Sequence, residues 1–330
     1  MAILSNEKVL TLDYWKRAAH LQVGDYVFDK DGKLVRVKLV QEYRSEECFE
    51  VMFDDYLTVS GDKHLAFQLE NPKYRKRIHE YKGVQRFRRP LARMYVDDLH
   101  EHSLKDARSR HLYSLPTAKP LEFPAQDLPV PPFLFGFWFF NRRANKAMAA
   151  PRGKAKEIHQ KFKDHGYKVI LGAKVPTGEQ EFRVFPTIES QLAPNIPTKI
   201  PNNYLLAAPQ QRLELLQGIM HAKSRQYSPK RDTFRFAAIN YPTIVQIQAL
   251  VESLGSRTTT KHDEYYNNYT IFFKTHHPLV ENQVSPPVKV HHARRFITNI
   301  TPLPAQLCVH IETEGADNTI LVGEGFIQTC

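Results

Sequence analysis

Both ends of the chain carry short β-strand patterns, whereas the middle alternates between helix and strand patterns. Between Val9 and Leu69, apolar and polar residues alternate in short runs, and Asp31-Gly32 predicts a tight hairpin turn because glycine accepts the positive φ that such turns need. The same pattern returns over 296–304, 307–313, 319–322 and 325–329. Chain termini often lie close together, and surface loops accept inserted domains. The sequence therefore predicts one β domain built from both ends, which carries an inserted domain.

The middle of the chain predicts an α/β domain with a weak internal repeat. Phe133–Phe140 is a dense apolar and aromatic run, which taken alone predicts a buried helix. Lys154–His165 is a basic amphipathic stretch followed by Gly166, a typical helix cap. Further helices are predicted over 209–220 and 243–254, and strands over 233–239 and 265–274. Helix, strands and helix thus follow one another twice.

Composition marks the borders between these parts. From Asn71 onward, basic residues are interleaved with Tyr74, Tyr81 and Phe87, which suits contact with phosphates and bases. A solvated linker that covers the β core is the alternative. Prolines at 116, 120, 124, 129, 131 and 132 then predict an extended connector. We therefore divide the chain into a β domain (1–70 and 280–330), a basic arm and connector (71–129) and an α/β domain (130–279).

The composition also limits the functional classes. A chain of 330 residues with 42% hydrophobic and 25% charged residues is long enough for two folded units. No apolar run approaches the roughly 20 residues that span a bilayer, and the N-terminus lacks the apolar core of a secretory signal. We therefore expect a cytoplasmic protein without a membrane partner, and a monomer. The formal net charge of +11 makes nucleic acid the expected partner.

Cysteine usage argues against a disulfide framework and against a zinc site. The chain has three cysteines, Cys48, Cys308 and Cys330, without CxxC spacing and without a histidine-rich ligand cluster. From the residues alone, Cys48 and Cys308 are expected to be small buried core residues.

Stretches at the two ends resemble the splicing motifs of inteins, whose splicing module has the all-β, horseshoe-shaped Hint fold. The opening motif is matched by 2–11 with the Leu-x-x-Gly-Asp turn at 21–25, the second motif by 59–65, and the closing motifs by 307–314 and 318–329. These motifs occur at both ends in the order of the family. The resemblance implies protein splicing, which needs no cofactor, and flanking host exteins as partners, in a bacterial, archaeal or phage-infected cell.

The resemblance assigns splicing positions to particular residues. The nucleophile that begins splicing would stand at Ala2, and His64 would help to activate the first peptide bond. The closing motifs add Cys308, His310, Thr329 and Cys330 as candidate catalytic positions, and Cys330 stands either where the first extein residue would be or as a replacement.

Several of these positions depart from the family. The first acyl shift needs a nucleophilic side chain, which Ala2 lacks, and only Met1 precedes it in this sequence. The terminal His-Asn pair is missing, and Gly61 stands where the family usually has Thr. We therefore expect that this chain is unable to splice.

The middle resembles a LAGLIDADG homing endonuclease of the kind found in phage-terminase and helicase inteins. Residues 134–142 match the first motif and 216–224 match the second. The resemblance implies two pseudo-symmetric αββαββα repeats, a double-stranded DNA homing site as partner, and Mg²⁺ as the nuclease cofactor. The two catalytic acids would stand at Asn141 and Lys223. Asn is a weak neutral ligand and Lys repels a cation, so we expect neither bound Mg²⁺ nor DNA cleavage.

A DNA-binding surface is expected to survive the loss of the acids, because basic side chains hold phosphates. The candidate contacts in the basic arm are Lys73, Arg75, Lys76, Arg77, Arg86, Arg88 and Arg89. Those in the first repeat are Arg142, Arg143, Lys146, Arg152 and Lys154. Those in the second repeat are Arg225, Lys230, Arg231, Arg235 and Lys261.

Three alternatives are compatible with the same residues. One is a non-catalytic DNA-binding scaffold or regulator derived from an intein, which would bind DNA without cutting it. Another is an active nuclease that uses other acids, for example Asp232 and Asp263, and would cut DNA with a metal. The third is an engineered precursor whose splicing is blocked. Restoring Cys at Ala2 and a terminal His-Asn with exteins should then yield ligated product.

Overall fold

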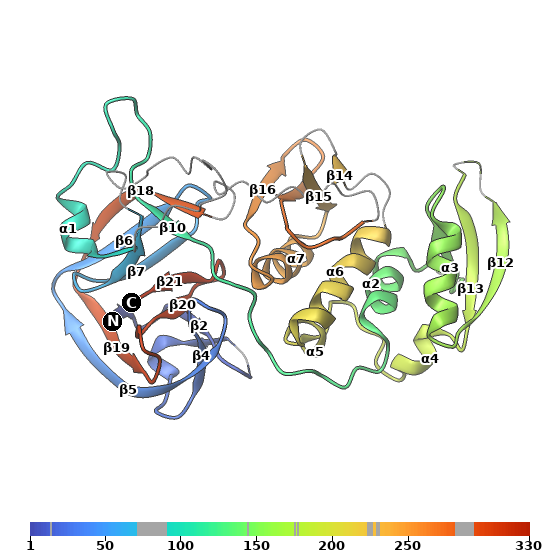
Figure 1. The fold of residues 1–330 in the computed structure, drawn as a ribbon, viewed down its shortest axis with the longest axis horizontal. Helices are drawn as coiled ribbons and strands as arrows, with labels where there is room; N and C mark the ends of the chain where they lie inside the picture. The colour runs from blue at the N-terminus through green and yellow to red at the C-terminus, as the bar shows by residue number, and fades with distance from the viewer. Residues whose placement is uncertain are drawn as a thin grey trace, which may run out of the picture. The chain divides into compact units, whose positions relative to one another are not determined.

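The chain folds into two compact units. The computed structural model describes residues 1–13, 15–70, 91–143, 145–174, 176, 178–222, 227–228, 232–280 and 294–330. One unit consists of Met1–Leu121 and Val290–Cys330, and the other of Glu122–Lys289. Both chain termini lie in the first unit, where they are marked in Figure 1. In the described segments, no helix combines the length and the apolar character that crossing a membrane requires.

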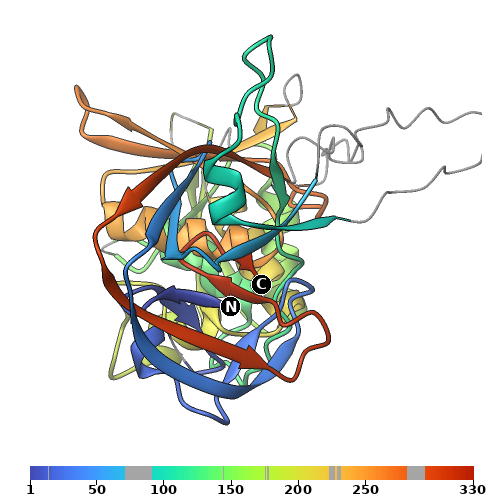
Figure 2. The ribbon, with the colours of Figure 1, turned by 90° about the vertical axis from the view of Figure 1, so that its left-hand side faces the viewer.

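A curled antiparallel sheet forms the body of the first unit. Its eight strands have the order β10-β18-β6-β7-β1-β19-β5-β4. The strands are β1 (Ala2–Leu4), β4 (Tyr26–Phe28), β5 (Leu34–Ser45), β6 (Cys48–Phe53), β7 (Thr58–Asp62), β10 (Ser114–Pro116), β18 (Arg294–Leu303) and β19 (Gln306–Thr313). Figure 2 shows the long strands β5 and β19 running beside each other along the outside of this unit.

Smaller elements complete the first unit. A four-stranded sheet has the order β21-β20-β2-β3, and β8 pairs with β9. These elements are β2 (Lys8–Leu10), β3 (Trp15–Arg17), β8 (Ala66–Leu69), β9 (Ala92–Tyr95), β20 (Ile320–Val322), β21 (Ile327–Thr329), a 3₁₀ turn (Ala18–His20) and α1 (Val96–His100).

The two ends of the chain share one hydrophobic core. Ile3 of β1 pairs with Val309 of β19, and both side chains are fully buried. Phe53 of β6 packs edge-on against Phe67 of β8, with ring centroids 5.9 Å apart. Alternating apolar positions in these strands point to the same side, as the period of two requires. The strand predictions for both ends are thus confirmed, and neither end buries its apolar face without the other.

The segment 91–121 differs from the expected arm and connector. Within it, β9 pairs with β8 and β10 pairs with β18, so these residues belong to the first unit. The proline-rich sequence that follows is extended, as expected, but the boundary between the units falls at Leu121 and not at residue 129. Local composition missed this because strand pairing depends on partners far away in the sequence. Residues 71–90 of the expected basic arm lie outside the described part of the chain.

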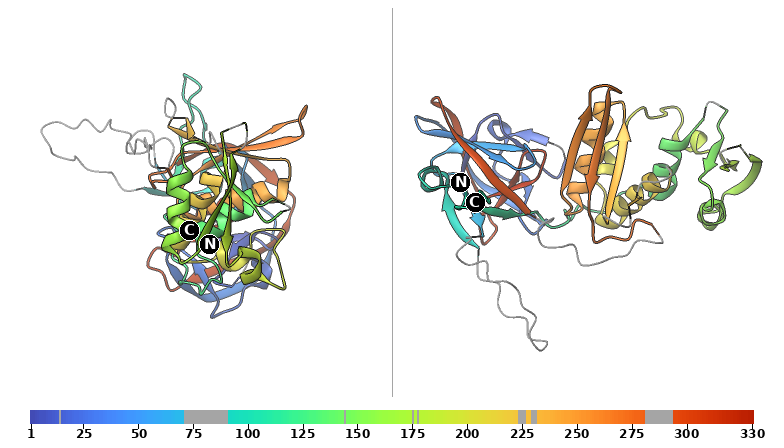
Figure 3. Two further views of the ribbon diagram at one scale, coloured as in Figure 1. Left: turned by 90° about the vertical axis from the view of Figure 1, so that its right-hand side faces the viewer. Right: turned by 90° about the horizontal axis from the view of Figure 1, so that it is seen from above.

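The second unit is an α/β domain with two sheets. One sheet has the order β11-β13-β12 and the other β14-β15-β17-β16. Figure 1 and the right panel of Figure 3 show α2 and α6 side by side between them. The strands are β11 (Met148–Ala150), β12 (Lys168–Lys174), β13 (Gln180–Phe185), β14 (Tyr227–Ser228), β15 (Thr233–Ala238), β16 (Thr258–Asp263) and β17 (Asn268–Phe273). The helices are α2 (Pro132–Asn141), α3 (Ala155–Asp164), α4 (Ile188–Leu192), α5 (Asn202–Leu205), α6 (Pro209–Ala222) and α7 (Tyr241–Ser253).

The four longer helices of this unit confirm the helix predictions to within about two residues. Gly166 and Gly255 both have a φ of +82° directly after α3 and α7, the left-handed conformation that favours glycine at a helix end. The expected αββαββα repeat is only partly matched. The second half has two strands before its second helix, but in the described residues of the first half a single strand, β11, stands between α2 and α3.

Helices α2 and α6 approach each other through a reciprocal pair of glycines. A Cβ atom on Gly136 would lie 2.4 Å from the carbonyl oxygen of Leu215, and one on Gly218 would lie 2.1 Å from that of Phe133. The carbonyl that each glycine faces therefore belongs to the residue three positions before the glycine of the other helix. This reciprocity places the two helices in equivalent positions, with the C-terminal ends of both motif helices near each other.

Candidate functional site

The first candidate site surrounds the Met1–Ala2 peptide in the first unit. Ala2 is fully buried in β1 and lies opposite His310 of β19. The Met1 carbonyl accepts a hydrogen bond from the Ile311 backbone N–H at 2.9 Å. The Thr329 hydroxyl donates to the Met1 sulfur at 3.0 Å. The structure therefore brings the predicted positions at Ala2, His310 and Thr329 together from opposite ends of the sequence.

Gly61 lies where there is no room for a side chain. A Cβ atom at this position would lie 2.4 Å from the Ala2 carbonyl oxygen, far inside van der Waals contact. Glycine at position 61, where the resemblance implies Thr, therefore allows β1 and β7 to lie close together. Ile3 is the strand partner of Gly61.

A hydrogen bond between a half-buried tyrosine and a buried aspartate lies near this peptide and was not among the sequence predictions. Asp62 is 2% exposed, accepts a 2.5 Å hydrogen bond from the Tyr43 hydroxyl, and accepts one from the His64 backbone N–H at 2.8 Å. Burial and the Asp62 carboxylate raise the pKa of Tyr43 above its usual value. The sequence offered no signal for this pair, because β7 (Thr58–Asp62) shows no alternation of apolar and polar residues. The His64 imidazole is exposed.

Two cysteines meet beside the same strands. The sulfur atoms of Cys48 and Cys308 lie 3.9 Å apart, and neither residue is more than 1% exposed. Burial and the neighbouring Cys48 raise the pKa of the Cys308 thiol to about 12, so this thiol is protonated at neutral pH. Cys330 is also buried, and its backbone N–H donates to the Ala66 carbonyl. The expectation of buried cysteines is confirmed.

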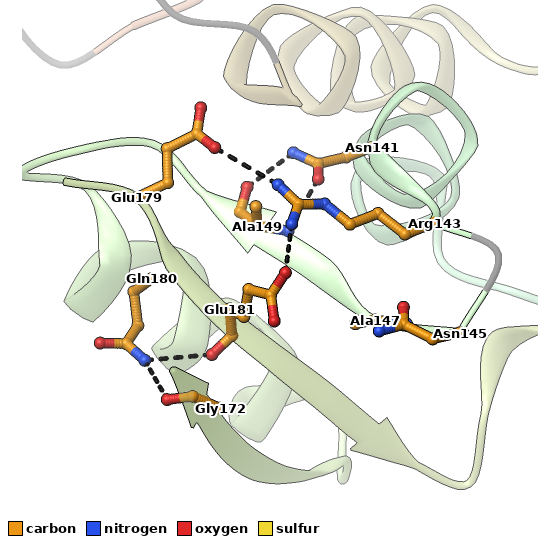
Figure 4. A network of polar contacts seen from close by, with 9 residues as sticks. All are labelled: Asn141, Arg143, Asn145, Ala147, Ala149, Gly172, Glu179, Gln180 and Glu181. Atoms are coloured by element: carbon orange, nitrogen blue, oxygen red, sulfur yellow. Dashed lines mark hydrogen bonds and ion pairs between the residues drawn. The ribbon is translucent and has the colours of Figure 1, made fainter. Parts of the chain in front are cut away.

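The second candidate site lies at the C-terminal end of α2, where the first nuclease acid was expected. The Asn141 amide nitrogen donates to the Ala149 carbonyl at 2.7 Å, and its oxygen accepts from the Ala149 N–H at 2.8 Å (Figure 4). The same nitrogen also donates to the Ala222 carbonyl at 3.0 Å. The side chain therefore ties α2 to β11 and to the end of α6. A carboxylate here would face two carbonyl oxygens, which an amide satisfies because it carries both donors and an acceptor.

The second nuclease position, Lys223, lies outside the described residues. Two residues earlier, His221 is buried on α6, and its Nε2 lies 3.1 Å from Oε1 of Glu157 on α3. Burial lowers the pKa of His221. Among the residues that the structure describes, no group of three or more His, Cys, Asp or Glu side chains is placed to hold a metal ion.

Three of the basic candidates of the first repeat contact other side chains of the protein. Arg143 forms ion pairs with Glu179 and Glu181 (Figure 4), and the Arg142 guanidinium stacks over the Trp138 ring at 4.8 Å. Lys154 lies 3.6 Å from Glu157. Lys146 and Arg152 are exposed, and so is Arg143 despite its ion pairs.

Two candidates of the second repeat share one face of a sheet. Arg235 of β15 lies opposite Phe272 of β17, and the Lys261 ammonium of β16 lies 5.9 Å from the centre of the Phe272 ring. Both basic side chains are exposed. The remaining candidates lie outside the described residues: Lys73, Arg75, Lys76, Arg77, Arg86, Arg88, Arg89, Arg225, Lys230 and Arg231.

The alternative pair of acids is far apart. Asp232 precedes β15 at the end of the sheet where Phe234 pairs with Phe273, whereas Asp263 ends β16 at the opposite end of the sheet. A strand of this length rises roughly 16 Å at about 3.3 Å per residue. Asp232 and Asp263 therefore do not form a shared metal site.

No protein-family model matches the chain. A curated relative, the replicative DNA helicase DnaB of Mycobacterium intracellulare, is 22% identical over 338 residues, which cover 96% of this chain and 56% of the helicase. The chain thus spans little more than half the length of the curated relative that it matches.

Similar solved structures belong to two kinds of protein. The MchDnaB-1 intein is 23% identical, with 21% of this chain and 53% of the intein covered and a TM-score of 0.20. The homing endonuclease I-DmoI in complex with DNA and Mn is 12% identical, with 44% of this chain and 89% of I-DmoI covered and a TM-score of 0.33. The chain is therefore similar to an intein and to a homing endonuclease, the two families that its motifs resemble.

Proposed function

We propose that this chain is an intein-type protein in which a Hint-like unit carries a LAGLIDADG-type domain that binds double-stranded DNA without cutting it. The observation that carries this proposal is the pairing of the two chain ends. Strand β1 lies between β7 and β19, so the N-terminal and C-terminal segments complete one sheet, and the second unit is inserted between them in the sequence. An inserted domain between two halves of one β domain is the arrangement that the motifs predict.

Splicing from Ala2 is blocked in this proposal. The buried methyl group has no electron pair to attack the Met1 carbonyl, and that carbonyl is held in a strand hydrogen bond with Ile311. The closing motifs carry Gln328 and Thr329 directly before Cys330 and contain no His-Asn pair.

DNA cleavage is also absent in this proposal. Two acids on paired helices are needed to hold metal ions against a scissile phosphate. The Asn141 amide is instead committed to three backbone groups, and it offers no negative charge. Lysine at position 223 would add positive charge to the same end of the helix pair.

The DNA-binding surface is proposed to include the exposed sheet face with Arg235 and Lys261, together with Lys146 and Arg152. These four side chains are exposed, whereas Arg143 is engaged in ion pairs within the protein. The similarity to a replicative helicase supports a helicase as the host protein, and both ends of this chain would then join host segments.

A binding experiment tests the DNA function directly. A randomised double-stranded library is selected on the full chain, and the affinity of the selected duplex is measured between 50 and 200 mM salt, a range in which roughly 10³–10⁵ of affinity is lost when 6–10 phosphates are contacted. The double variant Arg235→Ala/Lys261→Ala should bind more weakly, and its salt slope should fall by about one for each lost phosphate contact. Lys38→Ala, an exposed lysine of the first unit, is the matched control and should leave both unchanged.

The same duplex decides between binding and cleavage. Incubation with Mg²⁺ or Mn²⁺ should leave both strands intact. Metal-dependent cutting would overturn the non-catalytic assignment, and absence of salt-dependent affinity for any duplex would overturn the DNA-binding assignment.

A further inference from the structure

Cys48 and Cys308 are brought together by strand pairing between the two ends of the chain. Strand β5 is followed directly by β6, and β18 directly by β19; β5 pairs with β19, and β6 pairs with β18. Cys308 lies opposite Tyr43, five positions before Cys48, and Cys48 lies opposite Leu303, five positions before Cys308. The two cysteines therefore occupy equivalent positions in the two strand pairs.

The two sulfur atoms are close enough to bond after a small movement. They are 3.9 Å apart although the residues are 260 positions apart in the sequence. A disulfide needs roughly 2.0 Å between the two sulfur atoms, so they must approach each other by about 2 Å for the bond to form. Leu4, Tyr43 and Leu303 pack around them, and the Cys48 thiol donates to the Ser45 carbonyl at 3.5 Å. Folding thus gives each thiol a single sulfur neighbour at very high effective concentration.

We propose that Cys48 and Cys308 are a site of reversible disulfide formation, which locks the two halves of the first unit together when a peroxide oxidises the protein. The thiolate of one cysteine attacks a peroxide oxygen, the O–O bond breaks, and a sulfenic acid and water form. The second thiol then displaces the sulfenic oxygen as water and forms the S–S bond. Two thiols lose two electrons and two protons in total, and one peroxide becomes two water molecules. Reducing thiols reverse the bond by exchange.

The disulfide would change how the two segments of the first unit are connected. The bond would join β6 in the N-terminal segment to β19 in the C-terminal segment, which are otherwise connected covalently only through the second unit. Unfolding or cutting of the second unit would then leave the first unit in one piece. Because both thiols are buried and Cys308 is protonated at neutral pH, the reaction should be slow in the reduced, folded chain.

Peptide mapping of the full chain tests this inference independently of splicing and of DNA binding. The protein is treated with hydrogen peroxide in the presence of EDTA, which keeps metal ions from masking thiols. It is then unfolded in iodoacetamide and digested without reductant. The expected product joins the Cys48 and Cys308 peptides and is lighter by two hydrogen atoms, while Cys330 is alkylated. Alkylation of both Cys48 and Cys308, or a bond of either to Cys330, would overturn the proposal.

Three variants and one physical readout sharpen this test. Cys48→Ser and Cys308→Ser should each abolish the cross-link, whereas the matched control Cys330→Ser should retain it. Oxidation should raise the Tm of the first unit by about 5 to 10 °C in the wild type and in Cys330→Ser. After limited proteolysis of the second unit, the fragments should stay together on a non-reducing gel and separate with dithiothreitol. Separation without dithiothreitol would contradict the lock even if a serine variant failed to fold.

Discussion

Single residues decide which chemistry each unit retains. At the Met1–Ala2 peptide, a methyl group replaces the expected nucleophile, and Gly61 leaves room for the Ala2 carbonyl. At the end of α2, the Asn141 amide satisfies backbone groups that a carboxylate would repel. Both side chains are thus held by contacts with segments that are far away in the sequence.

A half-buried carboxyl group near the first site, that of Glu7, makes the stability of the fold depend on pH. Glu7 accepts a 2.7 Å hydrogen bond from the Ser60 backbone N–H, and burial together with nearby Glu50 raises its pKa from 4.5 to about 7. Because the folded state binds this proton more tightly, its stabilising effect is complete below pH 4.5. This stabilising effect is lost as the pH rises through about 7. At higher pH, Glu7 no longer changes the free energy of unfolding as the pH rises.

Glu7→Gln should remove this pH dependence. The variant keeps an oxygen acceptor for Ser60 and carries no charge, so at pH 8 it should exceed the wild type in unfolding free energy by up to about 3 kcal/mol. At pH 4 the two proteins should be nearly equal. Urea unfolding at several pH values measures the difference, and a wild-type curve with the same pH slope as the variant would contradict the raised pKa of Glu7.

At the scale of elements, the pairing of α2 with α6 organises the second unit. The helices touch at Gly136 and Gly218, because any side chain at these positions would collide with the carbonyl of the partner helix. Close approach lets Phe133, Phe137, Leu215 and Ile219 join one buried cluster. The pairing also brings the ends of both motif helices to one place, where Asn141 bonds the last turn of α6.

Gly218→Ala should destabilise the second unit by about 2 kcal/mol or more, because its Cβ would lie 2.1 Å from the Phe133 carbonyl oxygen and the helices must separate. Gly172→Ala on β12 is the matched control, since its Cβ would lie 3.2 Å from the Glu181 Cβ and 3.4 Å from the Glu181 carbonyl oxygen, and the change should cost far less. Trp138 fluorescence during urea unfolding, measured in a Trp15→Phe background, follows this unit. Equal midpoints for the two variants would refute the close helix contact.

At the scale of the whole molecule, the first unit depends on segments from both ends of the chain. Arg295 of β18 donates to Asp55 at 2.7 Å, and both side chains are at most 3% exposed. Lys8 and Glu324 also join the two segments at 2.7 Å, but about half of each side chain is exposed. The buried pair should therefore matter far more than the exposed one, because water and salt screen the latter.

Arg295→Met should cost about 3 to 5 kcal/mol of unfolding free energy, since it leaves the Asp55 carboxylate buried without its charged partner. Lys8→Met is the matched control and should cost less than about 1 kcal/mol. Hydrogen exchange of the 306–313 amides reports the opening of β19 in both variants. Similar protection in the two variants would show that the Arg295–Asp55 pair does not hold the segments together.

Local patterns predicted the elements of this protein well. The alternation in 307–313 predicted β19, and the apolar run at 133–140 predicted α2, because side-chain periodicity reports which face of an element is buried. The motifs also placed Ala2 and Asn141 at sites that the structure shows to be built from several segments. Residues such as Asp62 and Glu7 were missed, since a single buried carboxyl group has no periodic signature.

The amino-acid sequence by itself determined the β and α/β character of the two parts and the residues absent from the expected chemistry, because these depend on side-chain type and local spacing. Only the tertiary structure decided which distant residues meet. The assignment of 91–121 to the first unit, the contact of Gly61 with the Ala2 carbonyl and the approach of Cys48 to Cys308 all arise from strand pairing across long separations. Such pairings minimise the free energy of the whole sheet, which no local stretch of sequence encodes.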